Sequence, residues 1–287
     1  MGSSYSACQT KSLIRMSVIP NTRAQFPDAP LVDTHVHIFK RSMPLMPDPR
    51  HAPNYDFTAE NLESTLDTHG VKFCVIAAAS PWADCNDYVV ESLRTRPLWR
   101  GTVILEPTVG RQELDQLARD GIVGVRLPFI SMTKLPDLES WDYRRFLWRL
   151  ADLNWHVHLH LDGPRIPFVL SALERSGVKI VIDHLARPDP QLREKCAGFQ
   201  AVVRSVQKGN TWVKLSAGYR LGAHSVGLAH EMACQVGYER LLWASDCPFV
   251  GVESTTYQST LNWYDEAVPD ARNRRVMDRN AIDLYYR

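Results

Sequence analysis

The chain has 287 residues, of which 45% are hydrophobic and 23% charged, close to the average for a globular protein. Its 33 lysines and arginines nearly balance 32 aspartates and glutamates, so the charge gives no sign of a nucleic-acid partner. No apolar run reaches the roughly 18–20 residues that a membrane-spanning helix needs. The six cysteines show no CxxC spacing and are typical of reduced thiols. These features predict a cytoplasmic protein with no membrane segment.

Residues 1–29 precede the first apolar run, and we expect an N-terminal extension that is poorly ordered at its start. Its first 20 residues contain no continuous apolar segment of the kind found in secretory signals. Either Met1 or Met16 is the native start. We expect a single domain over residues 30–287.

From residue 31 onward, apolar strands alternate with amphipathic helices. The expected strands cover 31–36, 71–79, 101–107, 122–127, 155–162, 178–184, 212–216 and 240–246. The expected helices cover 61–69, 86–95, 111–120, 139–153, 165–176, 191–207, 225–237, 257–267 and 270–285. Continuous apolar strands are typical of a parallel sheet that is buried on both faces. Eight strand–helix units predict a (β/α)8 barrel rather than an open doubly wound sheet, since no GxGxxG follows the first strand.

Polar residues gather where the expected strands end, which is where such barrels carry their active sites. The i, i+2 spacing of His35 and His37 places both imidazoles on one face of the first strand. The other strand-end residues are Arg126, His160, Asp183, His184, Arg187, Arg220 and Asp246. Packing alone explains this convergence poorly, because buried polar groups cost stability. We therefore predict a shared pocket, and expect His156 and His158, lower in the fifth strand, to be structural.

These residue types allow two mechanisms. Histidine and aspartate are ligands that Zn²⁺ accepts, and a bound metal would lower the pKa of water towards ~7 and polarise a carbonyl. Without a metal, Asp246 would still act as a general base and the imidazoles as donors to a developing oxyanion. In either case the three arginines would bind substrate carboxylates through paired hydrogen bonds. Both mechanisms stay open at this point.

Five segments carry a family resemblance: VDTHVHIF (32–39), GVRLPF (124–129), VIDHLARPD (181–189), WASDCP (243–248) and RNAIDLY (279–285). They resemble the amidohydrolase superfamily, and more narrowly its amidohydrolase-2 branch, which contains lactone hydrolases. The resemblance implies that His35, His37 and His184 polarise a carbonyl or bind metal, and that Asp246 activates water. One divalent ion, Zn or Mn, would then have these ligands: His35, His37, His160 and Asp246.

The resemblance also implies a role for the three arginines. Arg126, Arg187 and Arg220 match residues that bind substrate carboxylates, and His160 is a further substrate-binding residue when no metal is bound. Tyr55, in the loop after the first strand, is a candidate for the wall that meets a planar ligand. We therefore expect a small, anionic substrate.

Three positions depart from the pattern of the pyrone dicarboxylate lactonases. Met132 stands where these enzymes have an arginine, Phe249 where they have a histidine, and His160 where they have a tyrosine. The first two departures argue against the same dicarboxylate, and the third restores a usual metal ligand of the superfamily. We expect a hydrolase that opens a carboxylated or aromatic-derived lactone by Asp246-activated water. The alternatives are a zinc-dependent non-oxidative decarboxylase of an aromatic or unsaturated acid, a lactone isomerase, and a barrel that only binds ligand.

Overall fold

The computed structural model describes residues 29–287, and residues 1–28 of the expected extension, with both candidate start residues, lie outside this range. Eight strands form one sheet in the order β1 to β8, and every neighbouring pair is parallel. The strands are β1 (Val32–Val36), β2 (Phe73–Ile76), β3 (Trp99–Val103), β4 (Ile122–Leu127), β5 (His156–Leu159), β6 (Lys179–Ile182), β7 (Thr211–Leu215) and β8 (Leu241–Trp243). The predicted (β/α)8 barrel is confirmed.

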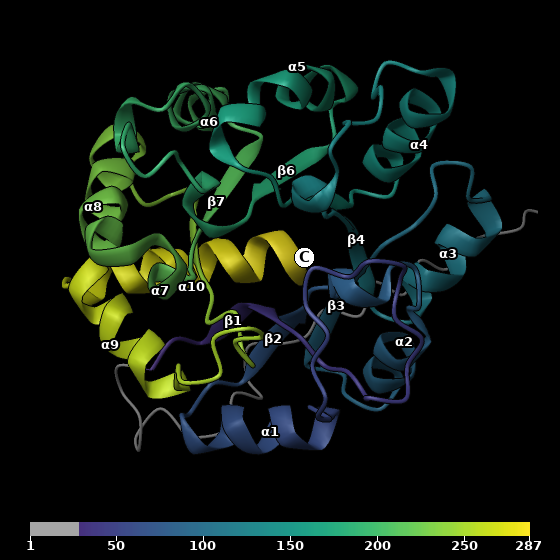
Figure 1. Ribbon diagram of the computed structural model, residues 1–287, viewed down its shortest axis with the longest axis horizontal. Coiled ribbons are helices and arrows are strands. Elements are labelled where there is room, and N and C mark those ends of the chain that lie inside the picture. Colours follow the sequence, from purple (N-terminus) through teal and green to yellow (C-terminus); the bar gives the residue numbers. More distant parts are fainter. Residues whose placement is uncertain (1–28) are drawn as a thin grey trace, which may run out of the picture.

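Helices surround this sheet on the outside (Figure 1). They are α1 (Ala59–Thr68), α2 (Asp87–Arg94), α3 (Arg111–Arg119), α4 (Trp141–Asp152), α5 (Pro167–Ser176), α6 (Ala197–Gln207), α7 (Gly218–Leu221), α8 (Ser225–Val236), α9 (Tyr257–Ala267) and α10 (Ala271–Tyr285). Helix α1 packs with an apolar face that includes Leu62 and Leu66. No helix within residues 29–287 is long and apolar enough to cross a membrane.

Most of the observed strands are shorter than the expected apolar runs, although β4 has the expected bounds. The run 71–79 pairs only over Phe73–Ile76, and the third strand lies at Trp99–Val103 instead of 101–107. Apolar residues beyond a strand end can pack on the core without ladder hydrogen bonds, so hydrophobicity overestimates strand length. The helix expected at 191–207 begins only at Ala197, because a 3-10 turn at Arg193–Lys195 precedes it.

Backbone hydrogen bonds between β1 and the segment after β8 close the barrel. Asp246 N donates to His35 O at 3.0 Å, and His37 N donates to Cys247 O at 2.8 Å. Closure therefore places the carboxylate of Asp246 beside the histidine pair of β1.

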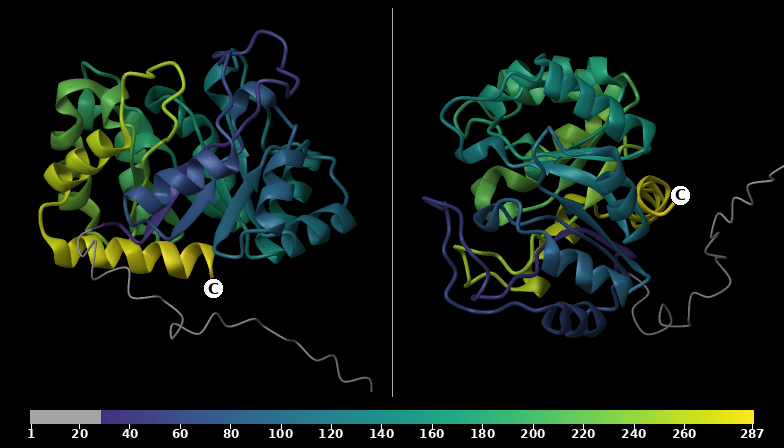
Figure 2. Two further views of the ribbon diagram at one scale, coloured as in Figure 1. Left: turned by 90° about the horizontal axis from the view of Figure 1, so that it is seen from below. Right: turned by 90° about the vertical axis from the view of Figure 1, so that its right-hand side faces the viewer.

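The two ends of the barrel differ. Helix α10 runs across one end (Figure 2, left), where Ala281, Leu284 and Tyr285 pack on strand side chains such as Val181. The loop after β1 and the loop after β8 rise at the opposite end, in purple and yellow-green. The barrel is thus plugged at one end and carries long loops at the end where its strands finish.

Candidate active site

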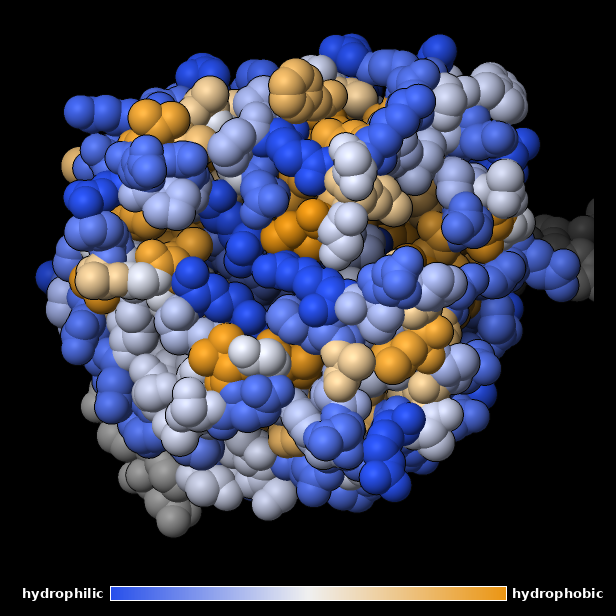
Figure 3. All heavy atoms as spheres, viewed as in Figure 1, coloured by the Kyte–Doolittle hydropathy of each residue, from blue (hydrophilic) through white to orange (hydrophobic). Residues whose placement is uncertain are grey.

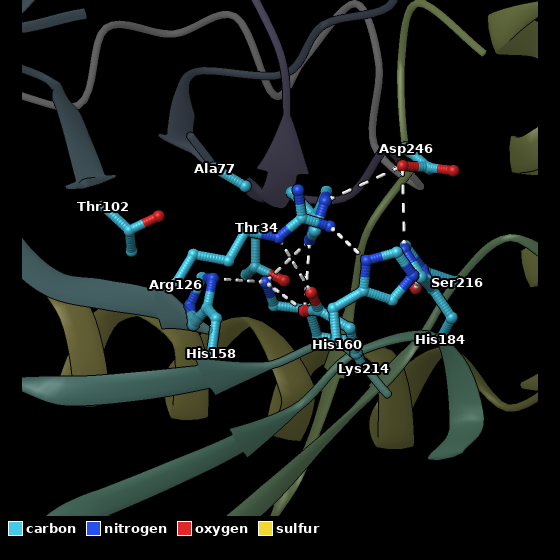
Figure 4. Close-up of polar contacts among 12 residues, drawn as sticks. Thr34, Ala77, Thr102, Arg126, His158, His160, His184, Lys214, Ser216 and Asp246 are labelled. Atoms are coloured by element: carbon cyan, nitrogen blue, oxygen red, sulfur yellow. Dashed lines mark hydrogen bonds and ion pairs between the residues drawn. The ribbon is translucent and has the colours of Figure 1, made fainter. Parts of the chain in front are cut away.

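The histidine pair and Asp246 meet where their strands end, and Figure 4 shows Asp246 beside His184. His35 Nε2 and His37 Nε2 are 3.2 Å apart, as expected for side chains that share one face of a strand. Asp246 Oδ1 lies 3.4 Å from His37 Nε2, 3.7 Å from His35 Nε2 and 3.8 Å from His184 Nε2. All four side chains are buried. The structure therefore brings together the four residues that the sequence predicts as catalytic.

The two oxygens of Asp246 have different surroundings. Oδ2 accepts hydrogen bonds from Tyr219 Oη at 2.6 Å and Arg220 Nε at 3.0 Å, whereas Oδ1 faces the imidazoles. Burial opposes the charge, yet the imidazoles and the Arg220 guanidinium hold the pKa of Asp246 well below its usual range. Asp246 is thus an ionised group with one oxygen fixed and the other available.

A strained turn presents His184 to the pocket. Residues 184–187, which follow β6, all have positive φ: 52° at His184, 53° at Leu185, 61° at Ala186 and 41° at Arg187. Such conformations are unfavourable for residues other than glycine and concentrate at functional sites. The Nδ1 of His184 lies 2.8 Å from Ser216 Oγ, and burial lowers its pKa to about 4. His184 is therefore a neutral imidazole at physiological pH.

All three predicted arginines line the pocket, and each contacts a carboxylate of the chain. Arg126 is buried and lies 3.3 Å from Asp183, Arg187 lies 3.3 Å from Asp162, and Arg220 lies 3.0 Å from Asp246. Arg126 also donates to Ala78 O at 2.9 Å. Part of their binding capacity is thus already used within the protein.

Two further pocket residues, Arg50 and His51, carry no functional prediction from the sequence. The pocket is lined by His37, Arg50, His51, Ala79, Ser80, Pro81, Trp82, Arg126, His160, His184, Arg187, Arg220, Asp246 and Val250. Arg50 and His51 belong to the long loop after β1, in the segment PRHAPNY, where no periodicity indicates which side chains point inward. A hollow near the middle of the face in Figure 3 is ringed mainly by hydrophilic residues.

Other predicted residues lie elsewhere. Tyr55 is not among the lining residues; its ring packs against Phe39 at 5.4 Å between centroids. Phe249 is buried against Tyr219, at 5.8 Å. Met132 is 42% exposed on the surface. The apolar wall of the pocket is instead contributed by Ala79, Pro81, Trp82 and Val250.

A metal fits part of the predicted ligand set. His35, His37 and Asp246 offer three ligand atoms that all lie within 4.8 Å of one another. His37 Nδ1 contacts Ala77 O at 2.7 Å, which leaves Nε2 directed at the site, as in many metal-binding histidines. His160 does not join this group: its Nδ1 lies 3.2 Å from Arg126 Nη2. Three of the four predicted ligands therefore form a geometry suited to a divalent ion.

A second buried cluster beneath the pocket has no counterpart in the sequence prediction. Lys214 Nζ lies 2.9 Å from His35 Nδ1, 3.0 Å from His158 Nδ1 and 3.1 Å from Asp183 Oδ1. Burial lowers the pKa of Lys214 to about 8, and the Asp183 carboxylate opposes that shift. Alternation along β7 predicts which face Lys214 occupies, but the identity of its partners depends on three other strands, β1, β5 and β6.

The fold and this arrangement of histidines, aspartate and arginines define a barrel hydrolase site of the amidohydrolase type. The chain belongs to the amidohydrolase family, whose model matches residues 32–287. The predicted family resemblance is thereby confirmed.

Among named relatives, 2-pyrone-4,6-dicarboxylate hydrolase of Comamonas testosteroni is 28% identical over 66% of this chain and 63% of its own length. The 4-sulfomuconolactone hydrolase of Hydrogenophaga intermedia is 23% identical over 76% of this chain and 75% of its own length. A structure from Pseudomonas putida, provisionally described as a 2-pyrone-4,6-dicarboxylic acid hydrolase, is 33% identical with a TM-score of 0.82. That match covers 90% of this chain and 97% of the other. These relatives support the predicted hydrolase class.

Proposed function

We propose that the protein hydrolyses a small lactone that carries an anionic group. The observation that carries this proposal is the environment of Asp246. Its Oδ2 is held by Tyr219 and Arg220, while its Oδ1 is directed at three imidazoles in a pocket lined by four arginines. A fixed, ionised carboxylate beside neutral imidazoles suits proton abstraction from water next to an ester carbonyl.

In this mechanism Asp246 Oδ1 accepts a proton as water attacks the lactone carbonyl carbon. His184, beside Oδ1, and the buried Arg126 line the pocket where the oxyanion forms, so they stabilise its charge. The ring C–O bond then breaks, and the proton returns to the departing oxygen. The product is an open hydroxy acid or its tautomer. His160, which also lines the pocket, is positioned for substrate binding.

A divalent ion bound by His35, His37 and Asp246 would lower the pKa of a bound water and polarise the carbonyl. His37 keeps its orientation through Ala77 O, and Arg220 and Tyr219 keep Asp246 in place.

The arginines point to an anionic substrate. Arg126, Arg187 and Arg220 each contact a carboxylate of the chain, but Arg50 makes no hydrogen bond or ion pair with any described residue. Arg187 and Arg220 are close enough to lower the pKa of Arg50, after burial as the main cause. An unpaired guanidinium among like charges is a ready partner for a carboxylate or sulfonate.

The shape of the site sets a further requirement. The pocket beside Asp246 has a volume of only about 50 Å³, whereas an adjoining cavity of about 450 Å³ shares Arg187 and Arg220 with it. A ring lactone therefore requires side chains at the boundary to move aside, and Arg187, which pairs with Asp162, can do so while Arg220 stays on Asp246. The binding free energy of an anionic group that reaches this second cavity would offset the cost of that movement.

The deciding experiment assays a panel of lactones by proton release, with and without added Zn²⁺ or Mn²⁺. The panel pairs each carboxylated or sulfonated lactone with its neutral methyl ester. Turnover of anionic members and weak turnover of neutral ones is expected. No turnover of any lactone in either metal state would overturn the proposal, and release of carbon dioxide from an aromatic acid would support the decarboxylase instead. The cytoplasm stays our prediction for the compartment.

A further inference from the structure

Lys214 takes the central position in a group of side chains that would otherwise suit a cation. His35, His158 and Asp183 offer three ligand atoms within 4.8 Å of one another. The ammonium of Lys214 lies 2.9 to 3.1 Å from an atom of each. All four side chains are buried. The chain thus supplies its own cation directly beneath His35, on the side opposite His37.

Hydrogen bonds fix the proton on His35 from both directions. A backbone carbonyl can only accept, so Ala77 O requires the proton of His37 on Nδ1 and leaves a lone pair on its Nε2. That Nε2 is 3.2 Å from His35 Nε2 and 3.4 Å from Asp246 Oδ1, and with His37 neutral it is His35 Nε2 that donates to it. An ammonium can only donate, so Lys214 requires His35 Nδ1 to accept at 2.9 Å. The contacts of His35 with Lys214 and with neutral His37 therefore favour the same tautomer, with the His35 proton on Nε2.

We infer that Lys214 is a positioning residue that holds the proton of His35 on Nε2 and thereby weakens metal binding by His35, His37 and Asp246. A metal needs the lone pairs of both Nε2 atoms. Neutral His37 offers one, because its contact with Ala77 O places its proton on Nδ1. His35 offers one only after its proton moves to Nδ1, where it would point at the Lys214 ammonium.

Asp183 acts on His35 in the opposite direction. Its Oδ1 lies 3.2 Å from His35 Nδ1, and a carboxylate there would accept an Nδ1–H proton and so favour the metal-binding tautomer. The buried Oδ1 also lies 3.1 Å from Lys214 Nζ, so the ammonium and His35 Nδ1 are both within its reach. Lys214 and Asp183 therefore compete for the same ring nitrogen, and the balance between them sets how readily a metal binds. The inference concerns the proposed site and not its reaction, so a negative lactone assay would leave it intact.

The first test is the tautomer of His35 in the full-length, metal-free protein. Long-range ¹H–¹⁵N spectra distinguish a protonated ring nitrogen from a bare one, and the His35 signals are identified by their loss in His35→Gln. We expect protonated Nε2 and bare Nδ1. A proton on Nδ1 overturns the inference, whatever the activity of the protein.

The second test is titration with Zn²⁺ alone. Lys214→Met is expected to tighten Zn²⁺ binding about tenfold, and Asp183→Asn to weaken it by about 10–100-fold, the usual range for partners of metal ligands. Lys179→Met, on the neighbouring strand, is the matched control and should change nothing. Weaker binding in both variants would show a merely structural role and overturn the inference.

Two checks keep this titration decisive. Thermal unfolding establishes that each variant is folded, and if Lys214→Met does not fold, the wild-type spectrum still decides the tautomer. Adding Asp246→Asn to Lys214→Met should abolish the gain in affinity. Retention of the gain would place the metal in the cluster of His35, His158 and Asp183 and overturn the inference.

Discussion

Two groups of charges lie one above the other in this barrel and differ in how they are paired. The inner cluster consists of His35, His158, Asp183 and Lys214, all buried and all in contact with one another through Lys214. The arginine rim consists of Arg50, Arg187 and Arg220 at the pocket, with Asp162 beside Arg187. The inner cluster is nearly closed to solvent, whereas the rim is partly exposed and carries more cations than carboxylates.

This difference shows how charged side chains serve two purposes in one barrel. Buried charges must be paired because their desolvation is costly, so the inner cluster fixes geometry and has no capacity left for a ligand. Rim charges remain hydrated and can exchange an internal partner for an external anion. Asp246 joins the two groups, since Oδ1 faces His35 and Oδ2 faces Arg220.

The largest expected effect comes from substitution of Asp246, which contacts both groups. Asp246→Asn keeps the shape but removes the base, so kcat should fall about 10²–10⁴-fold, the range for a lost general base. The Kd of an anionic lactone, measured by calorimetry, should stay within a few-fold of wild type. Asp162→Asn on the rim is the control. Retained turnover in Asp246→Asn would remove Asp246 from the mechanism.

The next largest effect is on stability, where loss of a carboxylate from the inner cluster is compared with loss of one from the arginine rim. Asp183→Ala leaves Lys214 and Arg126 buried without their carboxylate and should lower the free energy of unfolding by about 3–5 kcal/mol. Asp162→Ala breaks a half-exposed pair with Arg187 and should cost less than about 1 kcal/mol. Urea denaturation measures both. Equal losses would show that the two groups do not differ as described.

Removal of Arg50, the rim cation that makes no ion pair with a described residue, should affect substrate binding more than the chemical step. Arg50→Ala should raise KM for an anionic lactone about tenfold, since a hydrogen bond to a charged group contributes about 1.5–3 kcal/mol. kcat should change little, and the neutral methyl ester should be unaffected. Arg41→Ala, on the same loop but outside the pocket lining, is the control. An equal rise in KM for the neutral ester would contradict an electrostatic role.

The smallest effect is that of salt. Raising NaCl from about 0.05 to 0.5 M should increase KM for anionic lactones roughly two-fold, because exposed charges are screened over a few ångströms at high salt. The contribution of the inner cluster to the free energy of unfolding should stay nearly constant as salt rises, because buried pairs are screened much less. An unchanged KM would indicate that the rim does not attract the substrate.

Local patterns were sufficient to predict the barrel, the face shared by His35 and His37, and the strand-end positions of His184 and Asp246. Strand alternation and parallel-strand hydrophobicity are properties of neighbouring residues, so the sequence carries them directly. Strand limits were less well predicted, as at Trp99–Val103, because pairing ends where the neighbouring strand ends. The same limitation applies to α6, where a 3-10 turn replaces the expected first part of the helix.

Partner choice was decided only by the tertiary structure. Lys214 meets His35 and Asp183 because barrel closure and strand register bring β1, β6 and β7 together, and no spacing within β7 encodes that meeting. Arg50 reaches the pocket and Tyr55 does not, although both lie in one irregular loop. The sequence alone determined which groups stand at the top of the barrel. Their pairing, and hence which charge remains free for a substrate, depends on contacts between residues far apart in the chain.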